Sequence, residues 1–153
     1  MVHQNTLLKV AEIEISYRPN YKPSERPKIT ISEEAYEVLI ANWSLDRIEF
    51  LEEFKIILLN RRNRVLGVVN ISQGGVSGTL ADPKVILAIA LKSAASAVIL
   101  CHNHPSGELK PGREDLKLTR KLQEGAKLLD IEVMDHLIIS KDSFYSFSDE
   151  GLM

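Results

Sequence analysis

The sequence predicts an α/β or α+β domain with one central mixed β-sheet and helices on its faces. Short apolar runs of strand length mix along the chain with longer segments whose apolar residues recur at helical spacing. These segments do not follow a strict βαβ repeat, which favours one mixed sheet over a repeated parallel unit. The 153 residues suit a single domain, and the apolar fraction of 44% is ordinary for a packed core.

The first fifty residues are expected to form an N-terminal arm and a helix (1–50) ahead of the main domain (51–153). Residues 8–17 alternate apolar and polar side chains, which predicts a strand. Three prolines within residues 18–27 indicate an extended linker, because proline fixes φ and lacks a backbone donor.

A helix is expected after this linker, where Thr30 and Glu33 have the spacing of a capping box. Apolar residues follow at helical spacing as far as Trp43. The next two apolar runs, 54–59 and 65–71, predict a β-hairpin with a polar turn between them.

The second half of the chain supplies the remaining elements. After a loop marked by Gly74, Gly75 and Gly78, Asp82 as N-cap and Pro83 in the first turn predict a helix. Four further segments are predicted from their periodicity: a buried strand at 97–101, an amphipathic helix at 113–129, and strands at 131–139 and 144–147.

Composition restricts the compartment and the partners. The single cysteine, Cys101, cannot form an intramolecular disulfide, which favours a reducing compartment. The N-terminus lacks a signal-like pattern, and no run reaches the ~18 apolar residues of a membrane-spanning helix. We therefore expect a cytoplasmic protein without a membrane partner. The net charge of -2 gives no global attraction to nucleic acid.

Residues 102–107, which read His-Asn-His-Pro-Ser-Gly, carry the clearest chemical signal. They follow a predicted buried strand, and side chains two residues apart in an extended backbone leave on the same side. His102 and His104 could therefore bind one metal ion. Asp115 could be the third ligand if the intervening prolines and glycines fold the chain back. Alternatively, Asp115 is only an acidic residue in the first turn of a helix, where a negative charge is favourable.

This pattern resembles the JAMM motif of JAB/MPN metalloproteases, which is His-x-His, seven residues, serine, two residues and aspartate. His102, His104 and Asp115 match its spacing, while Gly112 stands at the serine position. The segment His-Asn-His-Pro-Ser-Gly, the later Asp135-His136-Leu137-Ile138-Ile139 and Tyr145-Ser146-Phe147 are similar to the RadC branch, from about Glu52 to Met153. The resemblance implies the JAB/MPN, cytidine-deaminase-like fold.

By this resemblance, His102, His104 and Asp115 would bind Zn²⁺ and leave a fourth position for water. A glutamate before the hairpin would act as the general base, and the RadC pattern selects Glu52 over its neighbour Glu53. Adjacent strand residues face opposite ways, so only one of the two can reach the site. The expected activity is zinc-dependent hydrolysis of an amide or peptide bond, with a peptide or protein as the substrate.

One departure bears on that activity. The family's serine stabilises the oxygen that becomes negative during the reaction, and Gly112 has no hydroxyl. A backbone N–H or the hydroxyl of Ser106 could act in its place, which makes Ser106 a candidate substrate-binding residue. A missing oxyanion donor costs about 10²–10³ in rate. The alternative function is a non-catalytic JAB/MPN module that binds protein or DNA partners.

Other polar residues have simpler interpretations. Cys101 should point away from His102 into the core. His136 could support the site or line a substrate wall, but a packed, hydrogen-bonded histidine is the commoner case. Arg61, Arg62 and Arg64 make a basic hairpin tip that favours a solvated turn over a nucleic-acid contact, because no aromatic stacking platform accompanies it. The helix-hairpin-helix segment usual in RadC proteins, many of them labelled DNA repair proteins, is not found here.

Overall fold

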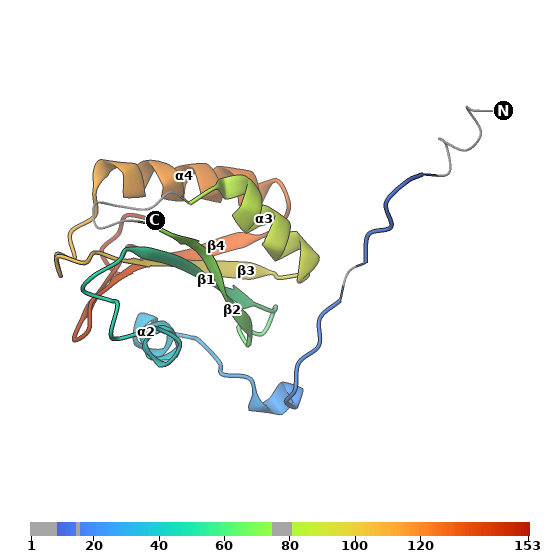
Figure 1. Cartoon of the computed structure of the whole chain (residues 1–153), viewed down its shortest axis with the longest axis horizontal. Helices are drawn as coiled ribbons and strands as arrows, with labels where there is room; N and C mark the ends of the chain where they lie inside the picture. Colours follow the sequence, from blue (N-terminus) through green and yellow to red (C-terminus); the bar gives the residue numbers. More distant parts are fainter. Residues whose placement is uncertain (1–8, 15, 75–80) are drawn as a thin grey trace.

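The computed structural model describes residues 9–14, 16–74 and 81–153 as three layers around one sheet. In Figure 1, α2 covers one face of the sheet, while α3 and α4 cover the other. The elements in chain order are the 3₁₀ turn η1 (Pro23–Glu25), α2 (Ser32–Ala41), β1 (Glu53–Leu59), β2 (Val65–Gln73), α3 (Pro83–Lys92), β3 (Ala97–Asn103), α4 (Arg113–Lys127), β4 (Glu132–Ile139) and β5 (Phe144–Ser146).

The sheet is mixed, as predicted. Its strand order is β2-β1-β3-β4-β5. β3 and β4 pair in parallel, and the other neighbours pair antiparallel. Each face of the sheet has its own apolar core, one built with α2 and the other with α3 and α4. The α/β fold class with a central mixed sheet flanked by helices is therefore confirmed, and it is consistent with the JAB/MPN fold.

Most predicted elements lie where the periodicity places them. The hairpin of β1 and β2, the buried strand β3, the long helix α4 and the last two strands are all present. At the start of α3, the side chain of Asp82 accepts a hydrogen bond from the backbone N–H of Lys84, as expected of an N-cap. Of the predicted glycine loop, Gly75 and Gly78 lie outside the described residues. None of the helices in the described ranges is long and apolar enough to cross a membrane.

The predicted strand at 8–17 is wrong for the residues that are described there. Residues 9–14, 16 and 17 have no regular structure, and Val10 and Ile13 are 80% and 85% exposed. In Figure 1 this arm runs away from the domain. A strand is stabilised by a hydrogen-bonded neighbour, and alternation alone does not supply one.

The capping box is displaced by one residue. The carboxylate that caps α2 belongs to Glu34, which accepts hydrogen bonds from the backbone N–H groups of Thr30 and Ile31 and from the Thr30 hydroxyl. Glu33 therefore does not have the predicted role. The helix begins at Ser32, so Glu34 and not Glu33 is the third helical residue, which is the position that reaches back to the cap.

Candidate metal centre

β3 brings two histidines to one face of the sheet, where the strand ends. His102 is 2% exposed and stacks on Phe54, its register partner on β1, with ring centroids 5.8 Å apart. His104 follows β3 directly, and its Nε2 lies 3.0 Å from Nε2 of His102. The same-side placement expected from their spacing is therefore what the structure has.

The N-terminus of α4 places Asp115 against both rings. Its Oδ1 lies 3.2 Å from Nε2 of His102, and its Oδ2 lies 3.6 Å from Nε2 of His104. The Gly112 N–H also donates to Oδ2, at 2.7 Å. Asp115 therefore lies in the first turn of the helix, as the simpler interpretation has it, and also faces both histidines; its role as a metal ligand stays a prediction.

The spacing of these three groups fits one metal ion. Ligands bound tetrahedrally at ~2.0–2.1 Å lie about 3.3 Å from one another by simple geometry. The three distances found here are 3.0, 3.2 and 3.6 Å. Such a set of two imidazoles and one carboxylate is suited to zinc and to neighbouring transition metals.

The electrostatics of the site also fit a cation. The Nδ1–H of His104 donates to the backbone carbonyl of Glu108 at 2.7 Å, which leaves its Nε2 as a lone pair in the neutral ring. The hydrogen bond that protonated His104 donates to the Asp115 carboxylate raises the pKa of His104. Burial raises the pKa of Asp115, but hydrogen bonds from the two histidines outweigh it and hold that pKa well below its ordinary value. A proton or a metal ion is thus favoured between these groups.

Glu52 joins the histidines, whereas Glu53 faces the other way. The ligand atoms of Glu52, His102 and His104 lie within 4.8 Å of one another, a spacing that suits a further ligand or a base acting across one water. Glu53 lies on the α2 side of the sheet, where its Oε1 pairs with Arg47 at 3.2 Å. Because Phe54 opposes His102, the same register extended by two residues places Glu52 opposite His104.

Asn103, between the two histidines, holds the segment that carries Glu52. Its side chain is fully buried on the opposite face of β3. Its Nδ2 donates to the carbonyls of Ile48 and Leu51, and its Oδ1 accepts from the N–H of Glu53. No sequence motif pointed to Asn103 as a functional residue. Its position at the end of an apolar strand was the available signal, because a side-chain amide buried there requires hydrogen-bond partners.

His136 on β4 contacts the site directly. It is fully buried, and burial holds its pKa well below the ordinary value. Its Nε2 lies 2.7 Å from Nδ1 of His102, and its Nδ1 lies 2.6 Å from Oγ1 of Thr119. His136 is thus both packed, as the simpler interpretation has it, and connected to a candidate ligand.

Two other candidates lie apart from the metal-binding atoms. Ser106 is exposed in the turn after β3, where its hydroxyl accepts from the N–H of Glu108 at 3.3 Å. Cys101 is fully buried in the core on the α2 side, and burial raises the pKa of its thiol well above the ordinary value. The expected inward orientation of Cys101 is confirmed, and its thiol lies on the face opposite to His102.

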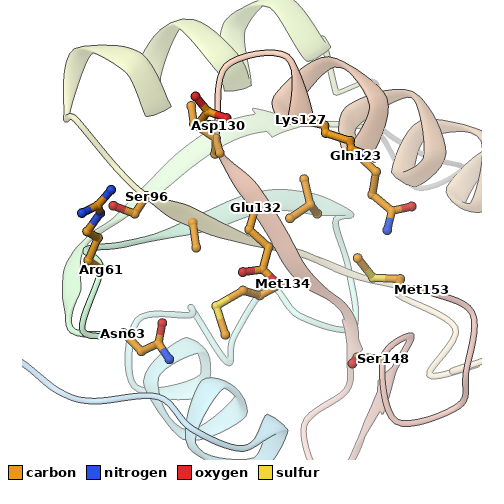
Figure 2. A pocket seen from close by; sticks show the side chains of 13 residues that line it. Arg61, Asn63, Ser96, Gln123, Lys127, Asp130, Glu132, Met134, Ser148 and Met153 are labelled. Carbon is orange, nitrogen blue, oxygen red and sulfur yellow. The ribbon is translucent and has the colours of Figure 1, made fainter.

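A cleft of about 270 Å³ opens beside the candidate ligands. Its lining includes Glu52, His102 and Asp115 together with the apolar side chains of Phe54 and Leu118. A wider cavity of about 710 Å³ lies at the other end of the sheet, where β3 and β4 begin (Figure 2). The histidines and carboxylates described above do not line that wider cavity, so the smaller cleft is the one associated with the chemistry.

Comparisons with known proteins identify a family and several relatives of this chain. The profile of the family described as RadC-like JAB domain matches residues 29–152. A UPF0758 protein of Porphyromonas gingivalis is 41% identical over 146 residues, which is 94% of this chain and 63% of the relative. UPF0758 proteins of Flavobacterium johnsoniae and Alkaliphilus metalliredigens are 43% and 39% identical over 66% and 74% of this chain.

The chain spans about half the length of these relatives, from 44% to 63%. The family match begins before α2, so it includes the helix that was predicted as part of the N-terminal region. The boundary at residue 50 stays a prediction. With the profile match covering most of the chain, the protein belongs to the family of RadC-like JAB domains.

Proposed function

We propose that this domain is a zinc-dependent hydrolase that cleaves an amide or peptide bond in a peptide or protein substrate. The observation that supports it most is the triangle of His102, His104 and Asp115, whose facing atoms lie 3.0 to 3.6 Å apart. In this proposal these three residues hold the metal, and the protein acts in the cytoplasm.

A bound zinc ion would supply Lewis-acid chemistry, lowering the pKa of water toward ~7 and polarising a carbonyl. Glu52 is within reach to take a proton from the attacking water and to pass it to the leaving nitrogen as the C–N bond breaks. Phe54 and Leu118 line the cleft beside it, where they would exclude bulk water from the reacting bond.

The oxyanion donor differs from the family's serine. Gly112 provides only its N–H, and that group already donates to Asp115 at 2.7 Å. In our proposal the hydroxyl of Ser106, which lies in the exposed turn after the histidines, binds the substrate instead. The oxygen of this hydroxyl accepts from the Glu108 N–H in a long contact of 3.3 Å, which leaves the hydroxyl proton free to donate.

The second candidate function is a non-catalytic JAB module that binds a protein or nucleic-acid partner. The glycine at the serine position favours it, because a binding module needs no oxyanion donor. The basic hairpin tip of Arg61, Arg62 and Arg64 is its candidate contact with nucleic acid.

Metal content measured by elemental analysis tests the proposal first. We expect about one zinc per chain in the wild type and in Glu52→Gln, and none in His104→Ala or Asp115→Ala. Glu114→Ala is the matched control for Asp115→Ala, because it removes an acid from the same helical turn whose side chain is 85% exposed. Absence of metal from the wild type, even after zinc is supplied, would refute the hydrolase.

Turnover of a peptide library then separates the two functions. Glu52→Gln should retain zinc and lose about 10²–10⁴ in rate, as expected on removal of a general base. Zinc loss in this variant would make Glu52 a ligand. A zinc-loaded wild type that cleaves nothing would favour the binding module.

A further inference from the structure

A chain of three hydrogen bonds, two of them buried and one partly buried, connects two of the three candidate metal ligands through residues that have no assigned role. It begins at the backbone carbonyl of Asp115, passes through Thr119 and His136, and ends on Nδ1 of His102. Its three contacts measure 2.7, 2.6 and 2.7 Å. Thr119 is 3% exposed and His136 is fully buried, so water does not compete for these groups.

The position of each proton follows from the first contact. A threonine hydroxyl has one proton, and here it is donated to the Asp115 carbonyl, which can only accept. The Oγ1 of Thr119 must then accept from His136, which places the proton of that ring on Nδ1. The Nε2 of His136 is left with its lone pair, so it accepts from the Nδ1–H of His102.

The donor-to-acceptor direction of these hydrogen bonds determines which nitrogen of His102 can bind a metal. With its proton on Nδ1, His102 presents the lone pair of Nε2 toward Nε2 of His104, 3.0 Å away. The opposite direction of the hydrogen bonds would place a proton on Nε2 of His102, where it would exclude a metal ion. Nothing in the tautomer preference of a free imidazole requires this choice, so the neighbouring groups must impose it.

Packing keeps the connecting ring in place. His136 stacks on Phe147 with centroids 4.5 Å apart, and Phe54 meets its edge at 5.7 Å. The ring of His136 is therefore packed between two aromatic side chains, which favour its orientation between α4, β4 and β3.

We propose that Thr119 and His136 are positioning residues that fix the tautomer and orientation of His102 for metal binding. The inference rests on the metal site of the proposed function and adds two residues to it. Partners of this kind typically contribute 10–100-fold to metal affinity.

Zinc affinity of three variants, measured by competition with a chromophoric chelator, tests this inference. Thr119→Val keeps the shape and removes the hydroxyl, and we expect zinc to bind about tenfold more weakly. Thr119→Ser keeps the hydroxyl and should remain within about threefold of the wild type. Ser146→Ala is the matched control, because it removes another buried hydroxyl, one that donates to Asp135 and not to His136. It should lower stability without weakening zinc binding.

The protonation of the His102 and His136 ring nitrogens can be measured in the wild type, so this test does not depend on a variant that folds. ¹⁵N NMR of the zinc-loaded protein should show His136 protonated at Nδ1 and His102 protonated at Nδ1. Protonation of His136 at Nε2, or unchanged zinc affinity in a folded Thr119→Val, would overturn the inference while the metal site stands. Absence of zinc binding in the wild type would overturn both.

Discussion

The anchoring of Glu52 by Asn103 leads to a prediction for Asn103→Ala. The side chain makes three hydrogen bonds to the segment from Ile48 to Glu53, two buried at 2.6 and 2.7 Å and one partly buried at 2.8 Å. A hydrogen bond contributes about 0.5–1.5 kcal/mol net, so the three together contribute about 3 kcal/mol. The free energy of unfolding should fall by that amount.

The expected fall in melting temperature follows from the size of the domain. At about 2–4 °C per kcal/mol for a chain of this length, the midpoint should drop by about 6–12 °C. The stability of a small domain is about 5–15 kcal/mol, so the variant should still fold. Thermal unfolding followed by circular dichroism measures the shift.

The same variant should separate metal binding from catalysis. His102 and Asn103 remain in the ladder between β3 and β4, so zinc affinity should stay within about threefold. Turnover should fall by more than tenfold, because the segment before β1 no longer holds Glu52 against His104. Asn60→Ala is the control, since Asn60 also accepts hydrogen bonds from backbone N–H groups, but in the exposed hairpin turn.

Two outcomes would refute this reasoning. A midpoint within about 2 °C of the wild type would show that the Asn103 bonds are not needed to hold the segment. Lost zinc with unchanged stability would show that Asn103 acts on the histidines and not on Glu52.

Three further predictions concern the metal and its surroundings. Zinc affinity should fall about tenfold per pH unit once the pH is below the pKa of His104, because the metal must displace that proton, and a chelator titration from pH 8 to 5 measures it. The stability of the metal-free protein changes with pH in the opposite direction. The protonated His104–Asp115 pair stabilises the fold below pH ~6.5, and this contribution is lost as the pH rises through the raised pKa of His104. Removing zinc held at 100 times its Kd should cost about 2.7 kcal/mol and lower the melting midpoint by about 5–10 °C, and Asp115→Ala should abolish this difference. Gly112→Ser should change the free energy of unfolding by less than about 1 kcal/mol and leave zinc bound. Serine gains only a few tenths of a kcal/mol over glycine as an N-cap, and its Cβ would lie 3.3 Å from Oδ2 of Asp115. Calorimetry measures the change in stability, and loss of zinc from the variant would contradict the prediction.

The elements of the sheet were predictable because their apolar patterns are also their burial patterns. Every residue of β1 is buried, and this strand reads as a continuous apolar run interrupted only by Glu53 and Lys55. The arm at 8–17 shows the limit of that logic. Its alternation is strand-like, but pairing depends on a neighbouring edge that local sequence does not specify.

The site was predictable where spacing alone determines it, as for His102 and His104 on one strand. The contacts that support it connect residues far apart in the chain. Asn103 reaches a segment 50 or more residues away, and His136 reaches His102 across 34. Thr119 lies four residues after Asp115 on the buried face of α4, where its hydroxyl is indistinguishable in sequence from a tolerated core threonine.

The choice between Glu52 and Glu53 depends on the register of β1, and a polar contact on the far face secures it. Lys55 is 5% exposed, donates to Asn70 on β2 and lies 4.8 Å from the ring of Trp43. A slip of one residue would turn this ammonium into the apolar core under α3 and α4, at a cost of several kcal/mol. It would also exchange the glutamate that faces the histidines. A lysine on the α2 side of the sheet therefore favours the register in which Glu52, and not Glu53, faces the histidines.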